Sequence, residues 1–309
     1  MMLILKNLFY FLIFPGLLFL TIAGCLLHFI DRKITALVQS RIGPPWYQGF
    51  ADFFKLLYKE TLVPKNANTF LFFLAPLISF SGTLLASIIL LNILFGFYQS
   101  FIGDVIVIIY LLIFPSLGII LAGSASSNPI ASVGASRESK LMLGYELCLL
   151  ISFAIVILKN NSLFINSIIS NQPVIYSVSG LIAFLTSILC IHAKLGFVPF
   201  DIAEAETELI AGPFIEYSGP PLALFYLSKF ILFLFLPIFL VTMFWYSANI
   251  IFFILKFLII ITIMILIKNT NPRLRIDQAV KFFWIKLFVL NVISLILALI
   301  GKYYNILWL

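Results

Sequence analysis

The chain has 309 residues, of which 63% are hydrophobic and only 10% are charged, and its net charge is +7. So little polar surface excludes a soluble globule of this size and indicates an integral membrane protein. The positive charge lies mainly in the connections between apolar stretches, which indicates contact with lipid or partner proteins and excludes nucleic acid as the expected partner.

Apolar stretches long enough to cross a hydrocarbon core of roughly 30 Å recur along the whole chain. Helices are the expected spanning form, because the sequence lacks the short alternating segments of a membrane β-barrel. We predict an all-α integral membrane protein that forms a single membrane domain over residues 1–309. Its eight expected spans are 8–29, 70–95, 105–122, 141–158, 176–195, 222–243, 250–267 and 282–300.

The distribution of basic residues predicts the orientation of these spans. If the connections alternate between the two sides, twelve Lys and Arg lie on one side and three, Lys6, Lys159 and Lys302, lie on the other. By the positive-inside rule, the side with twelve is cytoplasmic. We therefore expect a multi-pass protein of the cytoplasmic (inner) cell membrane, with both termini outside and the long loops in the cytoplasm.

The first cytoplasmic loop combines a turn with a short amphipathic helix. Gly43, Pro44 and Pro45 prevent a continuous helix. Apolar residues then recur with helical spacing, and the opposite face is polar. The apolar face consists of Phe50, Phe53, Phe54 and Leu57, and the polar face carries Asp52, Lys55 and Lys59. Such a helix either rests on lipid headgroups at the membrane interface or holds a soluble partner.

The next cytoplasmic connection, 123–140, is expected to be a loop of small and polar residues. Small side chains permit close approach by another protein or by neighbouring loops, although linkers share this composition. Cys25, Cys148 and Cys190 are widely separated and form no C-x-x-C pair. The sequence therefore predicts neither a disulfide framework nor a thiolate metal site.

The densest charge lies between Pro199 and Gly219, which we call the acidic segment. It holds five of the twelve acidic residues of the chain, namely Asp201, Glu204, Glu206, Glu208 and Glu216. A helix across 201–208 would place three of these acids along one face. Carboxylates that lie close together raise one another's pKa and can hold and pass on protons near neutral pH. The alternative is a solvated acidic face that binds a basic partner.

Charged residues inside spans are costly and usually serve a function. Glu146 lies within the fourth span, and Lys194 is close enough to a span end to snorkel. His192 is either a packed polar residue or a proton relay. Asp104, at the start of the third span, is an exit carboxylate or a helix N-cap, and the sequence favours the cap.

Several motifs that cover nearly the full chain carry a family resemblance. In order they are RIGPP with the following FADFFKLLYKE and LVPKNAN, then GDVIVIIYLL, SNPIASVGASRESKLMLGYEL, PFDIAEAETELIAGPFIEYSGPPLALF and RLRIDQAVKFFW. They resemble the eight-helix membrane protein shared by respiratory complex I, where it is the H (or first) subunit, and the energy-converting (group 4) NiFe hydrogenases. GPPWYQ, NPIASVGASRE and EAETELIAGPFIEYSGPPLALF resemble the hydrogenase branch more closely.

The resemblance implies a non-redox anchor and coupling subunit of a membrane-bound oxidoreductase, with no catalytic centre, metal or cofactor in this chain. The NiFe centre and the iron–sulfur clusters are then expected in partners, namely the hydrogenase large and small subunits and an iron–sulfur subunit. Antiporter-like membrane subunits would move protons or sodium ions. The alternative is the H subunit of an NADH (or other donor) quinone oxidoreductase, which would form the quinone site and lie in the mitochondrial inner membrane.

The resemblance also implies roles for individual residues. The five acids of the acidic segment and Glu146 correspond to an ion-coupling path, and the further candidates for that path are Asp104, His192 and Lys194. Relatives often place an acid just before the PFD motif, whereas this chain has His192 and Lys194 there. The expected docking surface for the soluble arm comprises Arg41, Gly43, Pro44, Pro45, Lys55, Lys59, Arg137 and Glu138.

Overall fold

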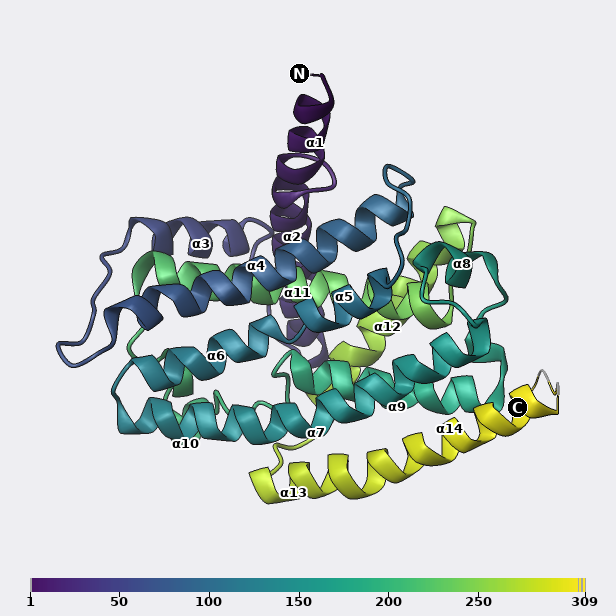
Figure 1. Cartoon of the computed structure of the whole chain (residues 1–309). Helices are drawn as coiled ribbons and strands as arrows, with labels where there is room; N and C mark the ends of the chain where they lie inside the picture. Colours follow the sequence, from purple (N-terminus) through teal and green to yellow (C-terminus); the bar gives the residue numbers. More distant parts are fainter. Residues whose placement is uncertain (1, 305, 307, 309) are drawn as a thin grey trace. The chain divides into compact units, whose positions relative to one another are not determined.

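The computed structural model describes residues 2–304, 306 and 308, and the side chains of residues 5–205, 208–304, 306 and 308. The described chain folds into helices joined by connections without strands (Figure 1). Its first elements are α1 (Met2–Leu12), α2 (Leu17–Val38), α3 (Gln48–Tyr58), α4 (Thr69–Leu94), α5 (Asp104–Leu111), α6 (Phe114–Ala125), α7 (Pro129–Asn160) and α8 (Ile165–Ser170). They are followed by η1 (Val174–Tyr176), α9 (Val178–Lys194), α10 (Glu206–Leu209), η2 (Gly212–Phe214), α11 (Gly219–Phe244), α12 (Ile250–Thr270), α13 (Ile276–Lys281), η3 (Phe282–Leu287) and α14 (Phe288–Tyr303).

The structure confirms an all-α membrane protein with about eight spans. Within the described residues, seven helical segments are long and apolar enough to cross a membrane, and α9 is a shorter apolar helix. Polar side chains begin several of these helices, because the first backbone N–H groups of a helix need acceptors. The Asn68 side chain accepts from the Leu71 N–H at the start of α4, and the Ser177 hydroxyl accepts from the Gly180 N–H at the start of α9.

Two expected spans are interrupted by proline. The first span is divided between α1 and α2 around Pro15, and the third is divided between α5 and α6 just before Pro115. Proline lacks the N–H that continues a helix, and its ring crowds the preceding turn. The helix α2 also continues to Val38, beyond the predicted end of the first span. The short amphipathic helix predicted in the first loop is present as α3.

The connection predicted at 123–140 is mostly helical, so that expectation was wrong. The helix α7 begins at Pro129, where proline fits the first turn, and the Asn128 side chain accepts from the Ile130 N–H. The small residues are used for close packing instead of flexibility. A Cβ added to Gly123 would lie 2.6 Å from the Ala131 carbonyl oxygen, so α6 and α7 approach each other at a distance that only glycine allows.

The chain divides into two compact units. Unit 1 comprises Met1–Phe97, Ile108–Ser139 and Asp201–Phe235, and unit 2 comprises Tyr98–Val107, Lys140–Phe200 and Leu236–Leu309. The helices α5, α7 and α11 contribute residues to both units. The single membrane domain expected from the sequence remains a prediction.

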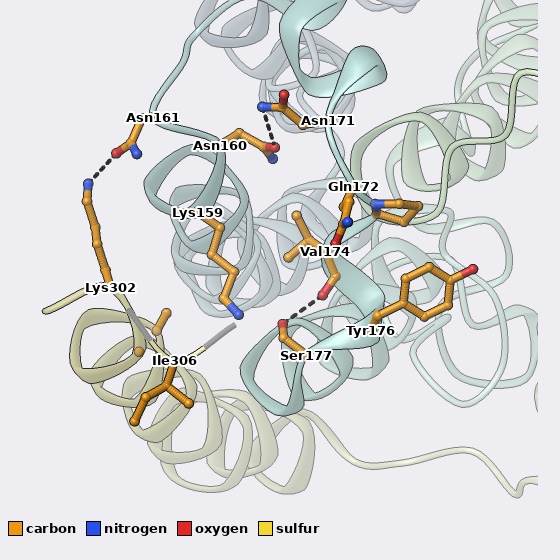
Figure 2. A pocket seen from close by; sticks show the side chains of 13 residues that line it. Lys159, Asn160, Asn161, Asn171, Gln172, Val174, Tyr176, Ser177, Lys302 and Ile306 are labelled. Carbon is orange, nitrogen blue, oxygen red and sulfur yellow. Dashed lines mark hydrogen bonds between the residues drawn. The ribbon is translucent and has the colours of Figure 1, made fainter. Parts of the chain in front are cut away.

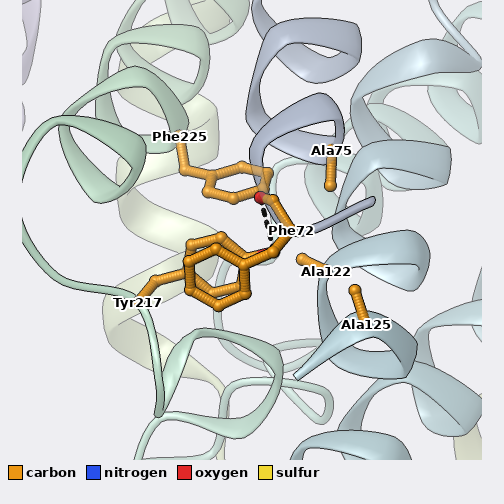
Figure 3. Close-up of a cluster of buried hydrophobic side chains, with 6 residues drawn as sticks. All are labelled: Phe72, Ala75, Ala122, Ala125, Tyr217 and Phe225. Carbon is orange, nitrogen blue, oxygen red and sulfur yellow. Dashed lines mark hydrogen bonds between the residues drawn. The ribbon is translucent and has the colours of Figure 1, made fainter. Parts of the chain in front are cut away.

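The core of unit 1 contains an aromatic stack between α4 and the end of the acidic segment (Figure 3). The rings of Phe72 and Tyr217 are parallel, with centroids 4.0 Å apart, and the Tyr217 hydroxyl donates to the Phe72 carbonyl oxygen at 3.1 Å. Phe225 of α11 packs edge-on against Tyr217, with ring centroids 5.3 Å apart. This contact holds the end of the acidic segment against two spans.

The core of unit 2 packs α9 against α14, which lie side by side (Figure 1). Their interface contains a polar cluster in an otherwise apolar region. The Thr186 hydroxyl donates to the Asn291 side-chain oxygen at 2.6 Å, and the Asn291 amide donates to the Cys148 carbonyl oxygen of α7 at 2.8 Å. Because buried polar groups need partners, these bonds fix the register of three helices.

Candidate functional site

The acidic segment folds mostly as an irregular loop, and residues 201–205 are not helical, so Asp201, Glu204 and Glu208 do not share the face of one helix. Its helical parts are the short α10, Glu206–Leu209, and the single turn η2, Gly212–Phe214, and residues 201–204 precede α10 without helical structure. Gly212 follows with φ 52°, and an added Cβ would lie 2.0 Å from the Ala203 carbonyl oxygen. The loop therefore folds back closely on itself at a position that requires glycine. As a result, its acidic side chains face partners from different elements.

Glu204 forms an ion pair with Lys229, a basic residue within α11. The Lys229 ammonium donates to both carboxylate oxygens, and each of the two side chains keeps 26% of its surface exposed. The ammonium also lies 5.2 Å from the centroid of the Phe214 ring. The pair therefore places two opposite charges at the junction of the acidic segment and the span α11.

Glu208 pairs with Arg137 of α7, at 2.6 Å between Nη1 and the carboxylate oxygen. The same Arg137 nitrogen lies 3.4 Å from the Ile202 carbonyl oxygen. The carboxylate is 59% exposed, which makes this the more solvated of the two ion pairs described for the acidic segment. Arg137, expected in the docking surface, is thus engaged by the acidic segment of its own chain.

Glu216 accepts a hydrogen bond of 2.6 Å from the Asn128 side chain. Both residues line a cavity of about 260 Å³ in unit 1, together with residues of the loops at 64–66 and 126–129. Beside it, burial raises the pKa of the Tyr217 phenol well above its usual range. Tyr217 therefore remains a hydroxyl that donates to the Phe72 carbonyl oxygen.

Glu146 and Lys194 form the most buried of the described ion pairs, within unit 2. The Lys194 side chain has no exposed surface, and the Glu146 side chain is 10% exposed. The expectation that Lys194 snorkels was therefore wrong, because its ammonium points inward and lies 5.4 Å from the centroid of the Tyr145 ring. A buried charge requires such a partner, since desolvation of an unpaired ion costs several kcal/mol.

The remaining candidates of the ion-coupling set are placed as follows. His192 is buried, and its ring nitrogen Nε2 lies 2.6 Å from the carbonyl oxygen of Val198, the residue just before the acidic segment. Asp104 is buried at the start of α5, and its carboxylate accepts from the backbone N–H groups of Val105 and Ile165. The bonds from Ile165 tie the start of α5 to the start of α8, and the N-cap of α5 that the sequence favoured stays a prediction. Asp201 is half-buried, and the side chain of Glu206 lies outside the described part of the chain.

The docking candidates of the first loop lie at the surface of unit 1. Arg41, Pro45, Lys55 and Lys59 are exposed, and Gly43 and Pro44 are half-buried. Glu138 is buried, so its side chain does not lie on the surface that a partner protein could contact. The apolar face of α3 is only partly covered, with Phe54 54% exposed. That exposed face is available to lipid or to a protein, the two occupants that the sequence left open.

Sequence reasoning missed the partners of the acidic side chains. Lys229 could have been suspected, because a lysine in an apolar run usually has a buried partner. Asn128 and the Thr186–Asn291 cluster gave no such signal, since polar residues of this size are common in membrane helices. Among the described residues, no three His, Cys, Asp or Glu side chains gather closely enough to hold a metal ion.

The fold and the site together define an all-helical, multi-pass membrane protein with ion-paired carboxylates in its spans and in the loop beside them. Comparison with known proteins narrows this class. The family model described as NADH dehydrogenase matches residues 11–299 of the chain. The chain therefore belongs to the NADH dehydrogenase family.

Individual relatives extend over nearly the whole chain. The H subunit of the NADH-quinone oxidoreductase of Geobacillus sp. (strain WCH70) is 34% identical over 86% of this chain and 85% of its own length. The corresponding protein of Brevibacillus brevis is 30% identical over 96% of this chain and 94% of its own length. Among solved structures, a chain of the membrane-bound sulfane sulfur reductase, an archaeal respiratory membrane complex, has a TM-score of 0.83 at 24% identity. That match covers 96% of this chain and 100% of the other and shows the shared fold.

Proposed function

We propose that this chain is the membrane anchor and coupling subunit of an energy-converting NiFe hydrogenase, within a multisubunit membrane oxidoreductase. The observation that carries the coupling role is the half-buried Glu204–Lys229 pair, which joins the acidic segment to the span α11. Charges in such positions are costly to maintain and commonly mark ion paths. The structural alternative is a pair that only fastens a loop, and ion translocation by a Glu204 variant distinguishes the two.

In this proposal the acidic segment responds to the redox state of a docked soluble arm. A change in the arm breaks or forms the Glu204–Lys229 pair, and this alters the charge balance beside α11. Glu146 and Lys194 form a second switchable pair within the spans. Glu208 and Glu216 take part as acids held at the loop surface by Arg137 and Asn128.

The redox centres belong to partner subunits in this proposal. Hydrogenase large and small subunits and an iron–sulfur subunit would hold the NiFe centre and the clusters, and antiporter-like membrane subunits would complete proton or sodium translocation. The exposed residues Arg41, Lys55 and Lys59 would contact the soluble arm. The distribution of basic residues supports a cytoplasmic membrane location with the termini outside and this face in the cytoplasm.

The hydrogenase branch is favoured by residues of this chain, namely GPPWYQ, NPIASVGASRE and EAETELIAGPFIEYSGPPLALF. A second candidate is favoured by the names of the relatives, which are H subunits of NADH-quinone oxidoreductases. Under that candidate the first loop and the acidic segment would line a quinone site. The two candidates share the coupling role and differ in the terminal electron acceptor.

Purification of the intact complex separates the two candidates. Membranes from the source cells are solubilised in mild detergent, the complex that contains this chain is isolated, and hydrogen evolution from a low-potential donor is compared with quinone reduction. The hydrogenase proposal predicts hydrogen evolution at the purified complex. Quinone reduction that is sensitive to rotenone-like inhibitors, without hydrogen evolution, would reject it and establish the second candidate.

A further inference from the structure

Unit 2 contains a cavity of about 630 Å³ where three helical segments end (Figure 2). It lies between the end of α7, the η1 turn that leads into α9, and the end of α14. Its polar lining residues include Lys159, Asn160, Asn161, Asn171, Gln172 and Lys302. This volume is within the range of cavities that hold small ligands, about 300–1,000 Å³.

The lining of this cavity is positively charged. Lys159 and Lys302 come from different helices, and none of the described residues that line the cavity is acidic. In Figure 2, Lys302 extends toward Asn161, to which its ammonium donates a hydrogen bond, and Lys159 extends toward Ser177. In the part of the chain that the structure describes, Lys159 has no carboxylate partner. Two lysines at one cavity without an acid indicate an anionic ligand.

The surroundings of the cavity indicate that this anion belongs to a lipid. Lys159 and Lys302 lie near the ends of two long apolar helical segments, and η1 leads into the apolar α9, so we expect the cavity where hydrocarbon gives way to headgroups. Next to it, α9 exposes Leu181 and Leu185, and α14 exposes Leu299, so acyl chains have apolar surfaces to cover. Tyr176, 73% exposed at the rim, is a residue type that favours the membrane interface.

A lysine near a helix end has a simpler explanation, because a cation stabilises the negative end of the helix dipole. That explanation accounts for each lysine separately but not for their convergence. Lys159 and Lys302 are two of the three basic residues on the side predicted to be outside, and both line the same cavity. The carboxamide side chains of the lining also offer N–H donors to the oxygen atoms of a ligand, and the helix-dipole explanation does not account for them.

We propose that this cavity binds the phosphodiester headgroup of an anionic phospholipid. Lys159 and Lys302 pair with the phosphate from two sides, the carboxamides donate to the headgroup oxygens, and the acyl chains lie along α9 and α14. This site is separate from the ion-coupling residues and does not depend on which electron acceptor the complex uses.

The test uses the purified complex, delipidated in mild detergent and titrated with phosphatidylglycerol or with phosphatidylcholine. Bound lipid is counted by native mass spectrometry. The wild-type complex should prefer phosphatidylglycerol. Lys159→Gln and Lys302→Gln should each weaken that binding about 5-fold, and the double variant about 30-fold. The matched control is Lys286→Gln, an exposed lysine on η3, just before α14, that does not line the cavity.

The outcomes are decisive in either direction. The double variant Lys159→Arg with Lys302→Arg keeps both charges and should retain the preference for phosphatidylglycerol. If the double Gln variant does not assemble, the single Gln variants test the proposal. Equal binding of phosphatidylglycerol by wild-type and Gln variants would overturn the proposal. Displacement of bound phosphatidylglycerol by inorganic phosphate at similar concentration would also overturn it, because the site would then belong to a soluble anion.

Discussion

Replacement of Glu146 by Gln should destabilise the protein strongly, because it leaves the Lys194 ammonium buried without a counterion. The Lys194 side chain has no exposed surface, so water cannot replace the lost carboxylate. Removal of one partner of a buried ion pair costs roughly 3–5 kcal/mol. Glu208→Gln provides the matched control, because that carboxylate is 59% exposed and pairs of this kind contribute about 0–1 kcal/mol.

The second half of this experiment separates stability from coupling. Glu146→Gln combined with Lys194→Met removes both charges and keeps the volumes similar, so it should recover most of the lost stability. If the pair takes part in ion movement, this stable double variant should still translocate ions poorly. Thermal unfolding of the purified complex measures the first effect, and ion uptake in proteoliposomes measures the second. A Glu146→Gln complex as stable as the Glu208→Gln complex would refute the argument from burial.

Three further sets of substitutions test the loops and their packing. Tyr217→Phe keeps the ring on Phe72 but removes the hydroxyl bond, so it should cost about 1 kcal/mol in unfolding measurements, whereas Tyr217→Ala should cost about 3–5 kcal/mol. Burial raises the pKa of Tyr217 in the folded protein, so the stability that this group contributes is fully present below the usual tyrosine pKa of about 10 and is lost as the pH rises above it. Tyr217→Phe should therefore lessen the loss of folding stability at alkaline pH. Gly212→Ala should disorder the acidic segment and increase its cleavage by protease. The control is Gly96→Ala, because Gly96 has a similar positive φ but open space around it, so this variant should show only the backbone strain of about 1–3 kcal/mol. Equal effects of the two substitutions would contradict the close packing of Gly212 at Ala203. Arg41→Ala should release the soluble arm during mild detergent extraction, whereas Lys6→Ala, on the side predicted to be outside, should not. If the Arg41→Ala complex also keeps the arm, Arg41 does not belong to the docking surface.

The spans could be predicted from the sequence because their physical requirement is local. A helix that crosses hydrocarbon needs a long apolar run, and every such run in this chain is visible without knowledge of its neighbours. The interruptions near Pro15 and Pro115 are also local in origin, since proline acts on its own turn. They were missed because the apolar runs continue through both prolines.

The helix at the start of α7 and the ion pairs could not be predicted in the same way. The segment from Ala131 to Ala135, in which four of five residues are small, is equally suited to a loop, and its helical packing involves close contact of Ala131 and Ala135 with Gly123 of α6. The pair Glu146–Lys194 joins residues 48 positions apart, and the pair Glu204–Lys229 joins residues 25 positions apart. The sequence identified the carboxylates as unusual, but only the packing of helices determines which base each one meets.

In the proposed function, this chain couples electron transfer to ion movement through its paired carboxylates. The decisive quantity is the number of ions translocated per electron by the purified complex in proteoliposomes, measured for the wild-type protein, for Glu204→Gln and for Glu60→Gln, an exposed acid outside the acidic segment. Coupling through the Glu204–Lys229 pair predicts that Glu204→Gln assembles and lowers this ratio, while Glu60→Gln leaves it unchanged. An assembled Glu204→Gln complex with the wild-type ratio would show that the pair only fastens the loop.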